Sequence, residues 1–312
     1  MIHVAFNIDD SYVKYCAVTL TSLFENNLNE QFSAYILGRH VSADGERLLR
    51  RVAEKYHQQV FIYPIEDKLI SHFPSLGPDS HISLATYLRL FLSDVVPPET
   101  NKVLYLDCDL LVNGPIADLW NIDLTNHSVG CVEDQWSGVA EKYELLDYHP
   151  RYSYFNAGVM LVNLDYWRNH RLVNRFTDYV ATHADKLQFA DQDVLNAVLH
   201  ESKLLIPMRW NLQDGFLRRK RKLRPNADLA LRQELDKAVI IHFTGSKKPW
   251  QYNSLSPYRR LYFKYLDLTE WKGERPSFPL TYRFKRMVDK LLFALRLKPH
   301  RYRPLRNLKA KD

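Results

Sequence analysis

The sequence predicts an α/β fold in which a mostly parallel central sheet is flanked by helices, followed by a basic amphipathic helix at the C-terminal end. Three observations lead to this prediction. Short apolar segments alternate with segments of helical periodicity, two acidic residues directly follow one apolar segment, and basic residues concentrate after position 282. Of the 312 residues, 46% are hydrophobic and 25% are charged, which is typical of a folded protein and excludes a disordered or fibrous one.

The N-terminal part of the chain shows the alternation in its clearest form. Residues 3–6 form an apolar segment of strand length, and apolar side chains then recur at helical spacing over residues 13–24. The same unit recurs, with a strand predicted over residues 34–37, a helix after the N-cap residue Ser42, and a strand over residues 60–63. Helices that connect successive strands in this way produce a parallel sheet.

The remainder of the chain adds further elements of both kinds. The pattern predicts a helix over residues 83–93, a buried strand over residues 102–106 and a helix over residues 191–200. Two more strands are predicted, over residues 158–163 and 239–243. We therefore expect the alternation to continue through most of the chain.

An acidic pair, Asp107 and Asp109, directly follows the strand predicted over residues 102–106. Positions i and i+2 of an extended segment point to the same side, so the two carboxylates project together while Cys108 faces the opposite way. Neighbouring carboxylates repel each other unless a proton or cation lies between them; Mg²⁺ or Mn²⁺ suits oxygen ligands, and an added imidazole favours Mn²⁺. The alternative is a pair that faces water or caps a turn. Both interpretations stay open, because open α/β sheets bind ligands where their strands end.

A second candidate segment begins at His242, near the end of the strand predicted over residues 239–243. Gly245 lets the backbone approach a ligand closely, and the following Lys247 and Lys248 can neutralise phosphate oxygens. The segment can thus supply both a metal ligand and a diphosphate clamp. The alternative is a histidine that is simply hydrogen-bonded at the end of a strand.

Two further segments carry polar side chains of open function. Asp191 and Asp193 flank Gln192 at the start of a predicted helix, where one aspartate is expected to cap the helix. The other is expected to hold a sugar hydroxyl or to stabilise positive charge at a reacting carbon. Residues 156–158, Asn-Ala-Gly, either present an amide and close backbone to a ligand or form a turn.

Taken together, these segments resemble glycosyltransferase family 8, retaining nucleotide-sugar enzymes of the GT-A fold, and in particular its bacterial lipooligosaccharide and lipopolysaccharide α-galactosyltransferases and glucosyltransferases. The matching segments occur in the family's order. They are residues 6–12, 81–89, 103–109, 154–159, 190–196 and 242–250. The resemblance implies the GT-A nucleotide-diphospho-sugar transferase fold. It also implies transfer of a hexose, galactose or glucose, from a UDP-sugar to a saccharide acceptor such as lipopolysaccharide or another cell-surface glycan.

The resemblance implies binding roles for individual residues. Asp107, Asp109 and His242 would bind Mn²⁺, with Mg²⁺ as the alternative, and the metal would bridge the diphosphate of a UDP-hexose and stabilise the leaving UDP. The positions that match donor-binding residues are Asn7, Asp9, Tyr12, Ile82, Arg89, Asp107, Cys108, Asp109, Asn156, Gly158, Gly245 and Lys248. Within this set, Asp9, Tyr12 and Ile82 would form the uridine pocket. Gly245 and Lys248 would hold the phosphates.

The resemblance also implies three catalytic residues, Gln192, Asp191 and Asp134. The first two match positions around the donor sugar, as do Arg89, Asn156 and Gly158, whereas Asp134 matches a position near both donor and acceptor. Gln192 would lie close to the anomeric carbon, where a double displacement would use a carboxylate. We therefore expect a front-face, internal-return mechanism in which Gln192 stabilises the oxocarbenium-like state.

The sequence departs from the family's pattern at several points. Asn7 and Ile8 stand where relatives often carry alanine, and Ser11 stands where asparagine is frequent. The match fades between about residues 211 and 237, where residues 217–224 contain six basic side chains. This basic segment is either a solvated charged loop or a contact for an anionic acceptor such as a phosphorylated lipopolysaccharide core.

The C-terminal tail differs from the rest of the chain in charge. Residues 283–312 hold eleven Lys and Arg against two Asp, a net charge of +9, which leaves −2 for the remainder of a chain whose total is +7. Apolar side chains recur at helical spacing between Phe284 and Leu295, with basic side chains around the other side. The pattern predicts a helix on the anionic inner leaflet or, alternatively, a helix packed on the main domain. We predict a catalytic domain over residues 1–275 and a membrane-associated tail over residues 276–312.

The predicted location is cytoplasmic, with peripheral attachment to the inner face of the cytoplasmic membrane. No apolar run approaches the roughly 18 residues of a membrane span, and three widely spaced cysteines favour a reducing compartment. Two other functions explain part of the pattern. A glycogenin-like self-glucosylating protein would need an acceptor tyrosine of its own. A nucleic-acid-binding protein would explain the basic tail but neither the acidic pair nor His242, so we expect no nucleic acid partner.

Overall fold

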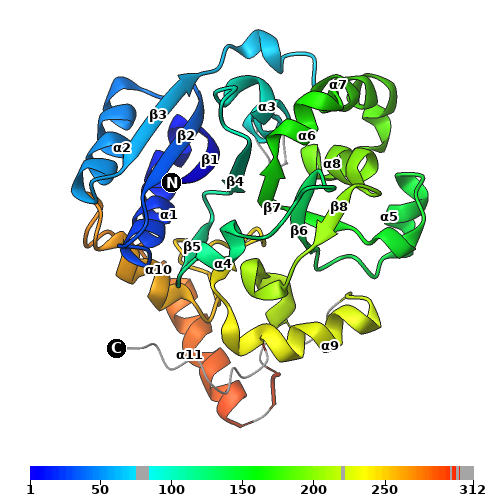
Figure 1. Ribbon diagram of the computed structural model, residues 1–312. Helices are drawn as coiled ribbons and strands as arrows, with labels where there is room; N and C mark the ends of the chain where they lie inside the picture. The colour runs from blue at the N-terminus through cyan, green and yellow to red at the C-terminus, as the bar shows by residue number, and fades with distance from the viewer. Residues whose placement is uncertain (75–83, 219–221, 296, 300–301, 303–312) are drawn as a thin grey trace.

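The computed structural model describes residues 1–74, 84–218, 222–295, 297–299 and 302, and its largest element is a seven-stranded sheet (Figure 1). The strands lie in the order β3-β2-β1-β4-β7-β6-β8. Their bounds are β1 (Ile2–Asp9), β2 (Phe32–Arg39), β3 (Gln59–Pro64), β4 (Lys102–Leu106), β6 (Val129–Glu133), β7 (Phe155–Asn163) and β8 (Lys203–Leu205). The strand order reverses between β1 and β4, which is where open α/β sheets bind ligands.

Pairing within this sheet is mostly parallel, as predicted. β1 pairs in parallel with β2 and β4, β2 with β3, and β6 with β8. β7 runs antiparallel to both of its neighbours, β4 and β6. The first residues of β7 therefore lie at the same edge of the sheet as the last residues of β1 and β4. At this edge the N–H of Asp107 donates to the carbonyl oxygen of Gly158 (2.8 Å).

Helices cover both faces of the sheet (Figure 1). α1, α2 and α10 lie on one side, and α3, α6, α7 and α8 lie on the other. The bounds are α1 (Val13–Glu25), α2 (Ala43–Lys55), α3 (Leu92–Val95), α4 (Ala117–Trp120), α5 (Ala140–Leu145), α6 (Leu164–Asn169), α7 (Leu172–His183), α8 (Asp191–Leu199), α9 (Pro225–Glu234), α10 (Arg259–Leu266) and α11 (Leu280–Ala294). The predicted N-cap of α2 is confirmed, because Ser42 Oγ accepts a hydrogen bond from the N–H of Gly45 (3.1 Å).

The helix predicted over residues 83–93 differs in kind from an ordinary α-helix. The described part begins as a 3₁₀ helix, η3 (Leu84–Phe91), and continues as α3. Residues i and i+3 eclipse each other in a 3₁₀ helix, so Thr86 and Arg89 project to the same side. Both side chains border the cavity described below.

A second, three-stranded sheet contributes His242 to the site described below. It has the order β5-β10-β9, with β5 (Leu110–Val112), β10 (Ile240–His242) and β9 (Leu212–Gln213). The strand predicted over residues 239–243 is thus confirmed, but it belongs to this sheet and not to the main one. β10 runs antiparallel to β5 with His242 opposite Leu110, which brings the histidine next to Asp109.

Several elements, most of them short, were not predicted from the sequence. These are the strands β5, β6, β8 and β9 and the helices α4, α5, α6, α7, α9 and α10. The strands contain two to five residues, which is too short for a period of two to stand out from a general apolar composition.

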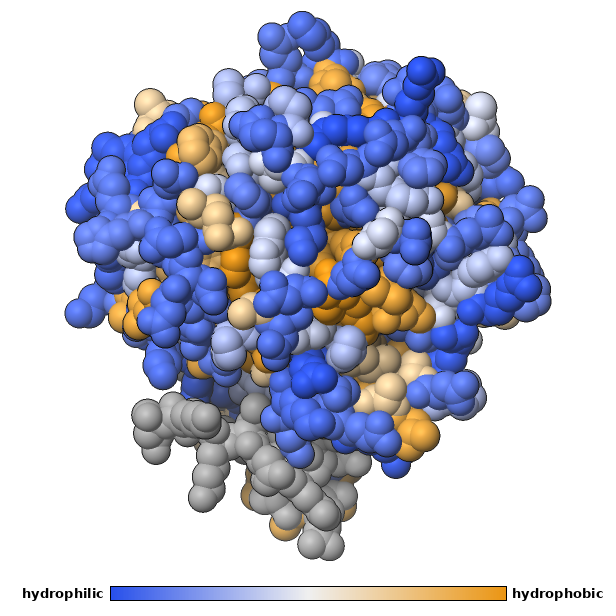
Figure 2. Space-filling view, viewed as in Figure 1, coloured by the Kyte–Doolittle hydropathy of each residue, from blue (hydrophilic) through white to orange (hydrophobic). Residues whose placement is uncertain are grey.

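Two apolar cores lie on the two faces of the main sheet. Val4 and Phe6 of β1 contribute to one core and Ala5 to the other, because successive side chains of a strand point to opposite faces. The outer surface drawn in Figure 2 is mostly hydrophilic. Within the described part of the chain, no helix has both the length and the apolar character that crossing a membrane requires.

Candidate functional site

A cavity of about 460 Å³ lies at the edge of the main sheet where β1 and β4 end and β7 begins. Its walls come from both sheets, from η3 and from the start of α8. The described residues that line it are Asn7, Ile8, Asp9, Tyr12, Ala85, Thr86, Arg89, Asp107, Cys108, Asp109, Asp134, Gln135, Trp136, Asn156, Gln188, Phe189, Asp191, Gln192, His242, Thr244 and Lys248. The parallel and antiparallel strands thus bring residues far apart in the sequence to one edge.

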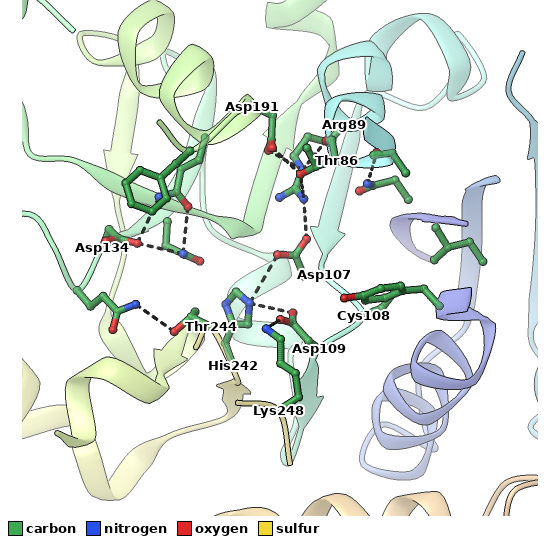
Figure 3. A pocket seen from close by; sticks show the side chains of 18 of the residues that line it. Thr86, Arg89, Asp107, Cys108, Asp109, Asp134, Asp191, His242, Thr244 and Lys248 are labelled. Carbon is green, nitrogen blue, oxygen red and sulfur yellow. Dashed lines mark hydrogen bonds and ion pairs between the residues drawn. The ribbon is translucent and has the colours of Figure 1, made fainter. Parts of the chain in front are cut away.

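The acidic pair and His242 form a cluster at the base of this cavity (Figure 3). Oxygen atoms of Asp107 and Asp109 and a ring nitrogen of His242 all lie within 4.8 Å of one another. His242 Nε2 lies 3.1 Å from Asp109 Oδ1 and 3.6 Å from Asp107 Oδ2. Two carboxylates and an imidazole at this spacing are a donor set that suits a divalent cation.

A chain of hydrogen bonds fixes the orientation of the imidazole. The backbone N–H of Gly158 donates to Asn156 Oδ1, which identifies that atom as the oxygen, and Asn211 Nδ2 donates to the same oxygen (2.9 Å). Asn211 therefore turns its Oδ1 to His242 Nδ1, 3.0 Å away, where it accepts the ring proton. With Nδ1 facing Asn211, Nε2 is the ring nitrogen that faces the two aspartates, where it can coordinate a cation placed between them. The residues therefore fit a bound metal ion.

Gly158 provides the space for this cluster. A Cβ atom at residue 158 would lie 2.1 Å from His242 Cε1 and 2.5 Å from Asp107 Oδ2, so any side chain would displace the ligands. Gly158 is not among the residues that line the cavity. The structure places it behind the cluster, between β4 and His242.

Lys248 compensates the charge of Asp109. Its Nζ lies 2.5 Å from Asp109 Oδ2 and donates to the carbonyl oxygen of Phe243 (2.7 Å). Burial acts to raise the pKa of Asp109, but the charges of Lys248 and His242 and their hydrogen bonds hold the pKa below its ordinary value. Asp109 is therefore ionised, as a metal ligand must be.

Arg89 connects the cluster to Asp191. Its Nη2 lies 2.9 Å from Asp107 Oδ1, its Nε lies 2.9 Å from Asp191 Oδ2, and Nη1 donates to the carbonyl oxygen of Ala157 (3.0 Å). Thr86 Oγ1 donates to Asp191 Oδ1 (2.5 Å). Burial raises the pKa of Asp191 to about 6, although the charge of Arg89 and the hydrogen bond of Thr86 act in the opposite direction.

Asp134, which Figure 3 labels, forms a second polar group on the cavity wall with Asn156 and Gln192. Asn156 Nδ2 donates to Asp134 Oδ2 and to Gln192 Oε1, both at 3.1 Å. Gln192 Oε1 also accepts from the N–H of Ala157 (3.1 Å), and its Nε2 donates to the hydroxyl of Tyr154 (3.1 Å). Burial raises the pKa of Asp134. The amide of Gln192 is therefore held in one orientation at the cavity wall.

The two aspartates at the start of α8 make different contacts, but neither caps the helix as predicted, because the N-cap residue is Ala190 and no side chain bonds there. Asp193 Oδ2 accepts from the backbone N–H groups of Gln188 and Phe189, both at 2.7 Å, and its Oδ1 accepts from the hydroxyl of Tyr154 (2.6 Å). Asp193 is thus the structural residue. Asp191 lines the cavity and is the one available to a ligand.

The end of β1 forms the far wall of the cavity. Asn7 accepts a hydrogen bond from the hydroxyl of Tyr105 and donates to the carbonyl oxygen of Ala85 (2.6 Å), while Asp9 accepts from the hydroxyl of Ser11 (2.5 Å). Tyr12 lines the cavity beside them. These residues present an aromatic ring and two polar groups on one wall. Ile82, the third residue of the predicted uridine pocket, lies outside the described residues.

Cys108 borders the cavity with its thiol directed into the protein. It belongs to the apolar core, and burial raises the pKa of the thiol well above its ordinary value, with a further contribution from a hydrogen bond with Cys16. This agrees with the prediction that Cys108 faces away from the two aspartates. It is therefore an inert wall residue.

Almost all of the predicted site residues that the structure describes line this one cavity; the exceptions among them are Gly158 and Gly245. Sequence reasoning missed several lining residues, namely Ile8, Ala85, Thr86, Gln135, Trp136, Gln188, Phe189 and Thr244. Four of these, Ile8, Ala85, Thr86 and Thr244, lie inside the matched segments, so their neighbours could have indicated them. Asn211, which orients His242, lies in the region where the match fades and has no signal in the sequence.

Comparison with known proteins places this site in a family. Residues 3–254 match the sequence model of glycosyl transferase family 8. The chain is 28% identical to General stress protein A of Bacillus subtilis, covering 87% of this chain and 95% of that protein. It is 29% identical to a lipopolysaccharide 1,2-glucosyltransferase of Escherichia coli, covering 87% and 79%. The crystal structure of the galactosyltransferase LgtC in complex with donor and acceptor sugar analogs superposes with a TM-score of 0.77 at 24% identity, over 91% of this chain and 100% of LgtC, which confirms the predicted GT-A fold.

Proposed function

The chain belongs to glycosyltransferase family 8, and we propose that it transfers a hexose, galactose or glucose, from a UDP-sugar to a saccharide acceptor with retention of configuration. The observation that carries this proposal is the cluster of Asp107, Asp109 and His242 at the base of the cavity, with Lys248 beside it. A nucleotide-sugar donor presents a diphosphate, which needs a cation of this kind and a neighbouring ammonium group.

Asp107, Asp109 and His242 would hold a divalent cation, for which we propose Mn²⁺ because the donor set mixes carboxylates with an imidazole. When bound, the cation acts as a Lewis acid that offsets charge on the leaving diphosphate. Asn211 keeps Nε2 of the histidine available for coordination, and Lys248 supplies a permanent positive charge at the same end of the cavity.

The second polar group supports a front-face mechanism. Gln192 is fixed by three partners at the cavity wall, so its amide dipole is preorganised to stabilise positive charge at the anomeric carbon. Asp191 is the carboxylate next to Gln192 that lines the cavity, but its oxygens are engaged with Arg89 and Thr86, which makes it a poor nucleophile. Asp134 lies beside Gln192, where it can accept a hydrogen bond from an acceptor hydroxyl.

A cell-surface glycan such as lipopolysaccharide is the acceptor that we propose, since the E. coli relative is a lipopolysaccharide glucosyltransferase. Trp136 lines the cavity near Asp134 and gives an aromatic face on which a sugar can stack. Lys222 lies over the Trp136 ring, with Nζ 5.1 Å from the ring centre. An acceptor that carries phosphate would meet this lysine.

We also propose that the C-terminal tail attaches the protein peripherally to the inner face of the cytoplasmic membrane. α11 exposes a row of apolar side chains that no described residue covers, with Leu280 79%, Phe284 65% and Leu291 60% exposed. Residues 283–312 carry a net charge of +9, which complements anionic lipid. An enzyme attached in this way would meet a lipid-linked acceptor where that acceptor is made.

The test of the activity is release of UDP. Purified protein is incubated with UDP-galactose and UDP-glucose separately, each with Mn²⁺ and with EDTA. We expect release from one donor that EDTA and Asp109→Ala both abolish. Absence of release and of nucleotide binding in every condition would contradict the proposal. A sugar covalently attached to Asp191 or Gln192 in intact-protein mass spectra would contradict the front-face mechanism.

A further inference from the structure

The basic segment of residues 217–224 places one of its side chains, Arg218, against Gly245. A Cβ atom at residue 245 would lie 2.7 Å from Arg218 Nη2, so the guanidinium occupies the space that a side chain there would fill. Gly245 belongs to the loop that runs from His242 to Lys248, whose last residue reaches the acidic cluster. The guanidinium of Arg218 therefore lies next to the loop on which the donor phosphates are expected to lie.

Two residues from different parts of the chain hold Arg218 in this position. Asp214 Oδ2 accepts from Arg218 Nη2 (3.0 Å) and Nε (3.3 Å). The hydroxyl of Tyr302 donates to Asp214 Oδ1 (2.9 Å), and the backbones of Tyr302 and Arg218 form an antiparallel β-bridge. Asp214 is buried, and the adjacent Gly215 packs directly on Gln135 of the cavity wall. The C-terminal segment thus reaches back to the catalytic domain at Arg218.

The guanidinium retains capacity for a ligand. Its Nε and Nη2 are engaged with Asp214, whereas Nη1 has no acceptor among the residues that the structure describes. The side chain is 24% exposed. A planar guanidinium can bind a carboxylate through one edge and a phosphate oxygen through the other.

The side chains that line the cavity carry more negative than positive charge. Five carboxyl groups line it against two permanent cations, Arg89 and Lys248. Both are committed, Arg89 to Asp107 and Asp191 and Lys248 to Asp109. A divalent cation would roughly offset the charge that a diphosphate adds and would leave the excess of negative charge in place. Additional positive charge beside Gly245 would therefore stabilise the bound donor.

We propose that Arg218 binds a phosphate oxygen of the donor diphosphate next to Gly245, and that Asp214 and Tyr302 are the residues that position it. This inference rests on the proposed UDP-sugar donor. It gives the first basic residue of this segment a function in donor binding. It also gives the C-terminal segment a second function beside membrane attachment, because Tyr302 lies eight residues after the end of α11.

The test separates the phosphates from the nucleoside by comparing UDP with uridine. Both ligands are titrated by calorimetry into the full-length protein at the same saturating Mn²⁺ concentration. Arg218→Gln is expected to weaken UDP binding about tenfold or more, as for a lost charge-assisted hydrogen bond, and to leave uridine binding unchanged. Arg218→Lys is expected to bind UDP with an affinity between those of the wild-type protein and Arg218→Gln, since it keeps the charge but loses the planar fork.

A matched control comes from α9. Arg232 forms the same i,i+4 ion pair with Asp228 (3.0 Å) on an exposed surface, so Arg232→Gln should bind UDP like the wild-type protein. Unchanged UDP affinity in Arg218→Gln, or an equal loss for UDP and uridine, would overturn the inference. If the wild-type protein binds no UDP at all, the proposed function fails, and this inference fails with it.

Tyr302→Phe tests the positioning. Removal of the hydroxyl is expected to weaken UDP binding by a smaller factor than Arg218→Gln and to leave uridine binding unchanged. In the Arg218→Gln background the same change is expected to have no further effect, because both substitutions act through one contact. A loss of the same size in both backgrounds would show that Tyr302 does not act through Arg218.

Discussion

Gly158 lies so close to His242 that a Cβ atom on the glycine would be 2.1 Å from Cε1 of the imidazole. The two residues belong to different sheets, Gly158 to β7 and His242 to β10. The missing side chain allows the small sheet to approach the main sheet closely enough for His242 to join Asp107 and Asp109.

Gly158→Ala is therefore expected to weaken Mn²⁺ binding at least about tenfold, on the scale seen when the surroundings of a metal ligand are disturbed. The new methyl group would also lie 2.5 Å from Asp107 Oδ2, and the backbone of Gly158 is tied to this strand end because its carbonyl oxygen accepts from the N–H of Asp107 (2.8 Å). Titration of the protein with Mn²⁺, followed by electron paramagnetic resonance, measures the effect.

Gly130→Ala is the matched control, because Gly130 lies on β6 in the same sheet. A Cβ atom there would first meet the side chain of Leu124 at 3.3 Å, which can adjust. Wild-type Mn²⁺ affinity in both variants would show that His242 is not a ligand in the way that we infer.

Asn211 is expected to hold the imidazole of His242 in the orientation that metal binding needs. Asn211→Ala removes the acceptor of the Nδ1 proton, so the ring is free to rotate or to change tautomer, and metal affinity should fall about 10- to 100-fold. The same Mn²⁺ titration measures it. Asn211→Asp keeps an oxygen for Nδ1 and should retain most of the affinity; equal losses in both variants would contradict this role.

Activity is expected to depend on pH through Asp191. Because burial raises its pKa to about 6, the ionised fraction of Asp191 grows as the pH rises through that value, and only the ionised form pairs fully with Arg89. We expect kcat/KM to rise as the pH increases towards and through 6 and then to level off. Asp191→Asn should lower the plateau and remove this rise, which a pH–rate profile of UDP release would show. An unchanged acidic limb in Asp191→Asn would assign it to another group.

The exposed face of α11 is expected to bind anionic membranes. The double variant Phe284→Glu/Leu291→Glu places two negative charges in the apolar row and should abolish co-flotation with vesicles that contain phosphatidylglycerol. UDP release in solution should not change, since both side chains project away from the protein.

Leu229→Glu is the control for this experiment. Leu229 lies on α9 and is 61% exposed, much like Leu291, but it lies outside the basic tail. Equal flotation of the double variant, the control and the wild-type protein would show that α11 does not bind the membrane.

The sequence predicted most of the larger elements, though not α7, because their periodicity is long enough to recognise. α1 and α2 extend over 13 residues each, and β1 and β2 over eight, and the helices and strands predicted there are present. The structure also brings Asp107, Asp109 and His242 together, three residues that stood out in the sequence because polar side chains follow apolar strands there. Short strands such as β9, with two residues, carry no such signal.

The sequence by itself determined the family, the fold class and the residue types available for metal and donor binding. Only the tertiary structure decided which of them meet. It showed that His242 comes from a second sheet, that Gly158 makes room for it, that Asn211 orients it, and that Asp191 lines the cavity while Asp193 supports the backbone. It also brought Tyr302 to Asp214 and Arg218 across more than 80 residues of chain. Periodicity reports which side chains are buried along one element, whereas a site depends on contacts between elements that are distant in sequence.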